Sequence, residues 1–285
     1  MVQTLFLAIL LAAVLALFSQ ALQRRVQDAL RRSPARIWLV PPALTGIFVL
    51  ASAVAGTVNW KLVLIVGAYT TAPVACAWFA MDFAAIALLW FPLEFPGSVA
   101  QLVPRHAQGF LHSVAYGIAI LLGLAIFLCF RHLQGMKYRL PDSARDWRYM
   151  LIGFALTAPV LAVVGIAIGF IPMAHMPTAS LSKMASAAVI IFFATALPEE
   201  ILFRSMIQNL MFQRFGAGTR TLVAASVIFG AAHLDNGPQA GPNWRYFILA
   251  TIAGFAYGKV FQRSSSVLAS TGFHALVDWT KHFFF

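Results

Sequence analysis

Apolar residues run through this chain in long stretches that short polar segments interrupt. Several stretches reach the roughly 18–20 residues that a helix needs to cross about 30 Å of hydrocarbon. The stretch 83–95 is shorter and flanked by prolines, so it could cross a membrane or lie at its surface. The pattern predicts an all-α, polytopic transmembrane helical bundle of about eight to ten spans. The clearest helices are expected near 4–21, 37–58, 61–81, 109–130, 149–172, 180–200, 219–234, 244–262 and 266–281.

Composition supports the membrane class. The chain is 61% hydrophobic and 10% charged, whereas soluble domains carry about 25% charged residues. Its net charge of +11 does not indicate nucleic-acid binding, because the cations lie in short loops and no basic face with interleaved aromatics occurs.

Cys76 and Cys129 lie inside apolar runs, so we expect small buried residues and no disulfide framework. No basic residue precedes the first apolar run, which predicts a retained span rather than a signal peptide.

Two basic segments bear on topology. In 23–32, arginines alternate with leucine and valine, which fits either an amphipathic helix on anionic lipid or a cytoplasmic stop-transfer loop; the loop is the favoured interpretation. The second segment is 131–148. Both would be cytoplasmic if 83–95 crosses the membrane, which gives ten spans and an external N-terminus.

From about residue 180 onward, ionisable residues enter the apolar runs at helical spacing. Glu199 and Glu200 stand side by side in the apolar stretch 187–204, in a chain with only three glutamates. A carboxylate at membrane depth costs at least about 2.5–3.5 kcal/mol, and a second one beside it adds repulsion. Such a pair persists where it faces a polar cavity, pairs with a cation or performs chemistry. We therefore expect it to be the functional centre.

The two glutamates are not equivalent. Arg204 follows Glu200 by four residues, the spacing of an ion pair on one helical face, while Glu199 points roughly 100° away. The structural interpretation is a buried pair that locks two helices. Pro198 allows either a helix that breaks at 195–198 and presents the carboxylates from a new N-terminus, or one continuous, kinked helix.

Three further patterns follow. His233 ends an apolar helix and taken alone is a weak signal. His274 and Asp278 are four residues apart, so both lie on one face; this is either a helix–helix hydrogen bond or part of a polar site, and membrane depth favours the site. Gly254 and Gly258 are also four apart and predict close helix packing.

These residues allow two kinds of water activation. A glutamate and a histidine can act as general base, with a second histidine stabilising the oxyanion. Alternatively, His233, His274 and a carboxylate could hold Zn²⁺ or another divalent metal. Spacing does not choose between them. A serine nucleophile is not indicated, because no Gly-x-Ser-x-Gly motif occurs.

The motif order resembles the CPBP family of CAAX prenyl proteases and bacteriocin-processing, or abortive infection, membrane proteins. The motifs are Glu-Glu-x-x-x-Arg (199–204), Phe-x-x-x-His (229–233), a glycine-marked helix (254–258) and His-x-x-x-Asp (274–278). The resemblance implies an intramembrane endopeptidase core over 180–285 that follows N-terminal helices and basic loops over 1–179. It also implies a peptide or protein substrate, no organic cofactor, and a multi-pass location in a cell membrane, in particular the bacterial inner membrane.

Carried over by position, the resemblance makes Glu199 the activator of water, with help from His233. Glu200 and Arg204 support the site. His274 and Asp278 stabilise the oxyanion or, with His233, complete a metal site. Members most like the eukaryotic enzymes carry asparagine where this chain has Asp278, and an ionised carboxylate would repel an oxyanion. Asp278 must then be protonated, orient His274 or bind a metal.

Two other classes compete with a protease. One is a non-catalytic immunity or scaffold protein whose polar cluster binds a partner. The other is a proton-coupled transporter, which the lack of an inverted repeat and the one-sided cluster disfavour.

Overall fold

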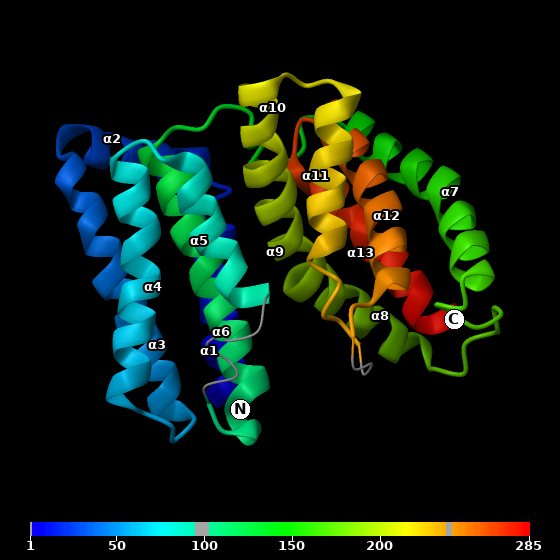
Figure 1. The fold of residues 1–285 in the computed structure, drawn as a ribbon, viewed down its shortest axis with the longest axis horizontal. Coiled ribbons are helices and arrows are strands. Elements are labelled where there is room, and N and C mark those ends of the chain that lie inside the picture. Colours follow the sequence, from blue (N-terminus) through cyan, green and yellow to red (C-terminus); the bar gives the residue numbers. More distant parts are fainter. Residues whose placement is uncertain (1, 95–102, 238–240) are drawn as a thin grey trace. The chain divides into compact units, whose positions relative to one another are not determined.

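Helices account for all the regular structure in the part of the chain that the computed structural model describes, residues 2–94, 103–237 and 241–285 (Figure 1). The chain forms two compact units, Met1–Gln134 and Gly135–Phe285. The division at 179–180 was drawn from the motifs and stays a prediction. In the second unit α7 (Ala144–Ala167), which carries no motif, packs against α12 and α13 of the polar region.

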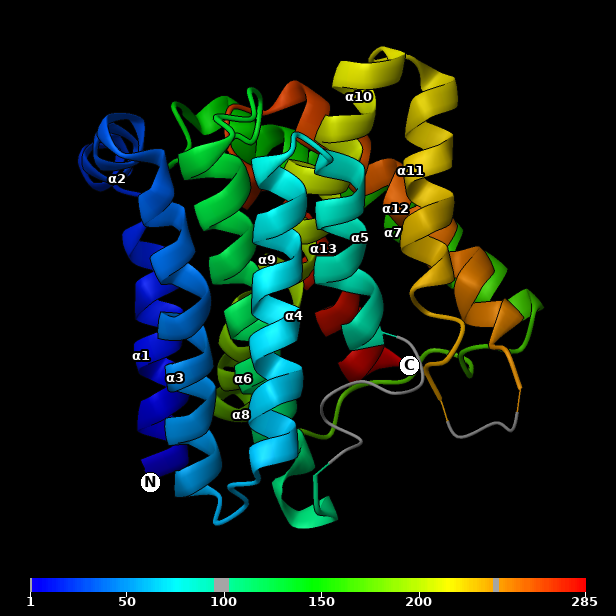
Figure 2. The same cartoon turned by 60° about the vertical axis from the view of Figure 1, so that its left-hand side comes forward.

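The first unit consists of helices that pack side by side. In chain order they are α1 (Val2–Ala16), α2 (Gln20–Arg32), the 3₁₀ helix η1 (Pro34–Leu39), α3 (Val40–Val54), α4 (Trp60–Trp78), α5 (Asp82–Glu94), α6 (Arg105–Gly123) and the π-helical η3 (Leu124–Phe130). Figure 2 shows α1, α3 and α4 lying alongside one another. A bidentate ion pair from Arg131 to Asp82, at 2.8 and 3.0 Å, fastens the start of α5 to the end of η3.

The segment that contains 23–32 is helical. α2 turns by 81° from α1, Leu30 is buried, and the Gln27 side chain donates to the Leu128 carbonyl at 2.9 Å. The favoured interpretation of this segment as a loop was therefore wrong in its local structure. Leu22, Val26 and Leu30 are four residues apart, which gives this helix one apolar face, and that face packs.

The second unit contains all the predicted motifs. After α7 come α8 (Leu181–Ile190), the π-helical η4 (Ile191–Ala196), α9 (Leu197–Glu200), the π-helical η5 (Ile201–Gln208) and α10 (Asn209–Phe215). Then follow α11 (Thr219–Ala231), α12 (Trp244–Arg263) and α13 (Val267–Phe284). α12 packs against α7, α11 and α13.

The two glutamates lie on an uninterrupted helix rather than at a new helix start. Residues Leu181–Phe215 form one apolar helix of 35 residues. Proline has no N–H to continue an α-helical ladder, and the π-helical η4 immediately before α9 absorbs the mismatch at Pro198. Of the two alternatives for 195–198, the continuous helix is confirmed.

The predicted glycine contacts are present on α12. A Cβ on Gly254 would approach Phe229 Cδ1 to 2.9 Å, and one on Gly258 would approach Leu222 Cδ1 to 2.5 Å. Both neighbours belong to α11, so these glycines let α11 and α12 approach closely. At the far end of α12, the Lys137 ammonium donates to three backbone carbonyls, which satisfies that helix terminus.

The expected eight to ten spans are not confirmed. Five of the described helices are long and apolar enough to cross a membrane, and the bent pair α1–α2 would make six. α5 and α11 have 13 residues each, or about 20 Å, which is shorter than the hydrocarbon core. Residue 95, at the end of the expected stretch 83–95, lies outside the described residues. α12 and α13 are not among these candidate spans; α13 carries His274 and Asp278, whereas Glu199, Glu200 and Arg204 lie on the candidate span Leu181–Phe215.

Candidate functional site

Glu200 and Arg204 form the ion pair that their spacing predicts. Arg204 Nε lies 3.3 Å from Glu200 Oε2, and both side chains are fully buried. The guanidinium also lies 4.5 Å from the centre of the Phe229 ring and 5.8 Å from that of Tyr257. This pair is therefore enclosed by aromatic rings rather than by water.

Three carboxylates surround one imidazole. His274 Nδ1 lies 3.2 Å from Glu200 Oε1, and His274 Nε2 lies 3.4 Å from Asp278 Oδ2 and 3.9 Å from Glu199 Oε2. The ring is 3% exposed and stacks on Tyr257 at 4.6 Å. Because each nitrogen faces a carboxylate, both are placed to donate, and these contacts favour the imidazolium form.

The carboxylates differ in their access to water. Glu200 is fully buried, whereas the side chains of Glu199 and Asp278 are 20% and 29% exposed. Glu200 shares its oxygens between Arg204 and His274. Glu199 and Asp278 therefore each combine a contact to His274 with a partly exposed side chain, whereas Glu200 does not.

His233 reaches the same region from the end of α11. Its Nδ1 donates to the Phe229 carbonyl at 2.8 Å, so Nε2 is left as an acceptor. Its ring packs edge to face against Phe229 at 4.8 Å, and Phe229 in turn meets His274 at 5.8 Å. One aromatic side chain thus separates the two histidines.

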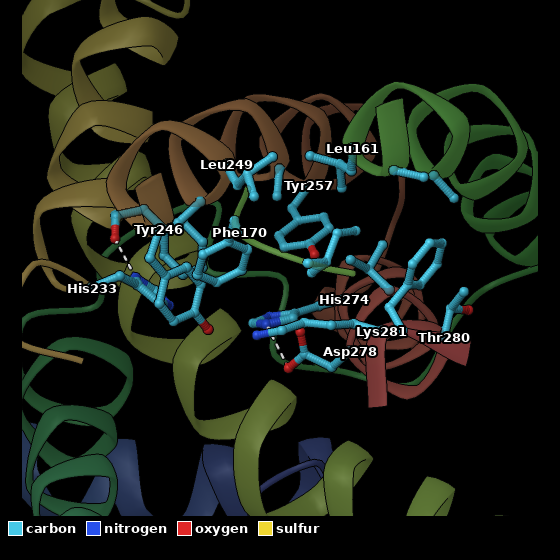
Figure 3. A pocket seen from close by; sticks show the side chains of 18 residues that line it. Leu161, Phe170, His233, Tyr246, Leu249, Tyr257, His274, Asp278, Thr280 and Lys281 are labelled. Atoms are coloured by element: carbon cyan, nitrogen blue, oxygen red, sulfur yellow. Dashed lines mark hydrogen bonds and ion pairs between the residues drawn. The ribbon is translucent and has the colours of Figure 1, made fainter. Parts of the chain in front are cut away.

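A cavity of about 80 Å³ connects these residues (Figure 3). Such a space holds several water molecules. The cavity is lined by His233, His274 and Asp278. Glu199 and Glu200 do not line it, but Glu199 Oε2 lies 3.9 Å from Nε2 of His274, which does. The remaining wall is mostly apolar. It includes Ala158, Leu161 and Ala162 of α7 and Leu249, Ala250 and Ala253 of α12.

A more open groove of about 640 Å³ shares part of its wall with the cavity. The shared residues are Phe170, Ile171, Tyr246, Asp278, Lys281 and Phe285. From there the groove continues along α8 and η4, over Ala187, Ile190 and Ile191. An extended chain lying in this groove would reach Asp278 at the junction with the cavity.

Sequence reasoning missed two polar residues of this junction. Lys281 lies seven residues after His274, so its helical spacing from His274 and Asp278 was a usable signal. Its ammonium sits 4.7 Å from the centre of the Tyr246 ring and 4.8 Å from that of Phe170. Tyr246 gave no local signal, because only the fold brings the start of α12 to the end of α11.

The residues proposed as metal ligands do not fit a three-ligand site. Each ring nitrogen of His274 already lies against a carboxylate, Nδ1 against Glu200 and Nε2 against Asp278. Across the described parts of the chain, no three His, Cys, Asp or Glu side chains are grouped so as to hold an ion.

The fold and the site define an integral, multi-pass membrane protein of α-helices with a buried ionisable centre. Residues 181–280 match the family model described as type II CAAX prenyl endopeptidase Rce1-like. This match covers about a third of the chain, and over that segment it supports the resemblance to CPBP intramembrane proteases that the motifs indicated. No curated protein and no solved structure matches the chain.

Proposed function

We propose that this protein hydrolyses a peptide bond near the membrane interface with a water molecule that Glu199 activates. The observation that carries the proposal is the cluster around His274. Glu199, Glu200 and Asp278 lie within 3.9 Å of its ring nitrogens, and His274 lines a cavity with His233. The family match supports the reaction class.

The proposed steps use only side chains of this cluster. Glu199 takes a proton from water, and His233 Nε2 orients that water by accepting its second hydrogen. The water oxygen attacks the peptide carbonyl carbon. The imidazolium of His274 stabilises the negative charge that develops on the carbonyl oxygen. Glu199 then passes its proton to the departing amine nitrogen as the C–N bond breaks.

Asp278 has an orienting role in this scheme. Its carboxylate accepts from His274 Nε2, so it holds the ring and favours its positive charge. Glu200 likewise accepts from His274 Nδ1, and the positive charge of Arg204 balances the charge of Glu200. The alternatives of a protonated or metal-bound Asp278 are not needed.

The substrate class follows from the family's description, a prenylated protein or peptide ending in a CAAX sequence. We propose a peptide of this class as the first probe, and the bacterial inner membrane as the location.

Hydrolysis by the purified protein in lipid vesicles tests this function. An S-farnesylated peptide ending in a CAAX sequence is incubated with the protein, and the products are read by mass spectrometry. We expect release of the last three residues, with one oxygen from ¹⁸O-labelled water in the new carboxylate, and no loss of rate with 1,10-phenanthroline. An intact peptide would contradict the proposed substrate and reaction. Inhibition that added Zn²⁺ reverses would contradict the metal-free mechanism.

A further inference from the structure

A developing oxyanion needs hydrogen-bond donors that are not already committed elsewhere. The cavity offers a short list of polar side chains. They are His233, Tyr246, Tyr257, His274, Asp278, Thr280 and Lys281.

Most of the nitrogen donors are already occupied. His274 directs both ring nitrogens at carboxylates, and His233 uses Nδ1 on the Phe229 carbonyl. Asp278, as the acceptor for His274, has no proton to give. The imidazolium of His274 can therefore contribute charge, but its N–H groups already have acceptors within 3.2 and 3.4 Å.

Location separates the remaining donors. Tyr257 and Thr280 line only the cavity, and Tyr257 lies under the His274 ring with 1% of its surface exposed. Tyr246 and Lys281 line both the cavity and the open groove. They therefore stand at the junction where a peptide lying in the groove would meet the polar cluster.

Tyr246 also lies next to the histidine that orients the water in the proposed mechanism. Its ring packs against that of His233 at 4.5 Å and 65°. Figure 3 shows His233 and Tyr246 on one side of the cavity, with His274, Asp278 and Lys281 opposite. A phenol here can reach a carbonyl that the water attacks from the His233 side.

Lys281 places a positive charge beside this ring. Its ammonium lies 4.7 Å from the centre of the Tyr246 ring, a cation–π distance that holds the ring in place at the junction. Within the described residues, no carboxylate lies within 4.0 Å of the Lys281 nitrogen.

We propose that Tyr246 is a catalytic residue, whose hydroxyl donates a hydrogen bond to the oxyanion of the tetrahedral intermediate and keeps its proton throughout. Lys281 is a positioning residue that acts through the phenol. This inference rests on the proposed peptide hydrolysis, and it supplies the donor that Asp278, unlike the asparagine of the related enzymes, cannot provide when ionised.

The test compares Tyr246→Phe with Tyr149→Phe in the vesicle assay with the farnesylated peptide. Tyr149 lies near the start of α7, where its hydroxyl accepts from Arg145 at 2.7 Å outside the site, so it is a matched control. Loss of one oxyanion donor lowers kcat on the order of 10²-fold. We expect that loss in Tyr246→Phe with KM within about twofold of wild type, and unchanged kinetics in Tyr149→Phe.

Two results would overturn the assignment. An unchanged kcat in Tyr246→Phe means that the hydroxyl does not contact the oxyanion, and a raised KM with unchanged kcat means that it binds only the ground state. Both require an active wild type and leave the proposed hydrolysis standing. A wild type that cleaves no peptide refutes the proposed function instead.

Discussion

Burial determines what Glu200 and Arg204 can do. Both side chains are withdrawn completely from solvent, and the carboxylate lies between one guanidinium and one imidazole. A fully buried, doubly engaged carboxylate cannot exchange protons readily with a water molecule. Glu199 differs from it by one position and keeps 20% of its side chain exposed. The chemical asymmetry of the two neighbours thus comes from the helix rotation between them.

Arg204→Met should be strongly destabilising. Removing the cation takes away one of the two positively charged partners of the buried Glu200 carboxylate, and breaking a buried ion pair typically costs about 3–5 kcal/mol. Thermal unfolding in detergent should show a large fall in Tm, whereas adding Glu200→Gln to the same chain should restore much of it. Equal Tm values for wild type and Arg204→Met would contradict the importance of the buried pair.

The sequence predicted contacts within a helix better than contacts between helices. The spacing of four residues placed Glu200 beside Arg204 and His274 beside Asp278, and both contacts are present. The contact of His274 with Glu200 joins residues 74 apart in sequence, so no local pattern encodes it. That Glu200 and His274 belong to one site could be expected only from the resemblance to the protease family.

At the scale of elements, close packing of α11 on α12 positions His233. Gly230 lies on α11 three residues before it, and a Cβ there would approach the backbone carbonyl oxygen of Phe247 on α12 to 2.8 Å. That atom belongs to a helix backbone and cannot move aside alone. The two helices would have to separate, and His233 would move with α11.

Gly230→Ala should therefore destabilise the protein by about 1–3 kcal/mol, as overpacking does. Gly67→Ala on α4 is the matched control, because a Cβ at that glycine meets nothing within 4 Å. Alanine's higher helix propensity should make that change neutral or stabilising by up to about 1 kcal/mol. Denaturant or thermal unfolding of both variants measures the difference. Equal stability of Gly230→Ala and wild type would show that this contact relaxes freely.

Helix boundaries were largely predictable from the sequence, but whether the helix continues through Pro198 was not. Periodic apolar runs marked α4, α6, α7, α12 and α13 close to their observed positions. The helix passes Pro198, which lacks an N–H, by adopting π-helical segments before and after α9. A sequence pattern does not distinguish such a π-helical segment from a break in the helix.

At the scale of the whole molecule, hydrophobicity predicted the class of protein, but the expected eight to ten spans are not confirmed. Five or six of the described helices meet the length and composition of a membrane span. Short helices such as α5 raise the average hydrophobicity of the chain without having the length to cross. α12 and α13 are not among these helices, and they supply most of the polar side chains that line the cavity.

The candidate site consists of a few polar side chains set in a mostly apolar cavity among membrane-type helices. The groove leads along α8 and η4 to Asp278, and the cavity behind it contains His233 and His274. Two partly exposed carboxylates, Glu199 and Asp278, contact the same nitrogen of His274. We propose that Glu199 is the base and that Asp278 only orients the ring.

Steady-state hydrolysis by Glu199→Gln and Asp278→Asn, measured side by side in vesicles, tests this claim most directly. Loss of a general base lowers kcat by about 10²–10⁴-fold, so Glu199→Gln should fall in this range while remaining folded. Asp278→Asn should retain a kcat within about tenfold of wild type, since an amide can still hold His274 and can donate to the oxyanion. Near-normal hydrolysis by Glu199→Gln, with loss of hydrolysis in Asp278→Asn, would contradict the account.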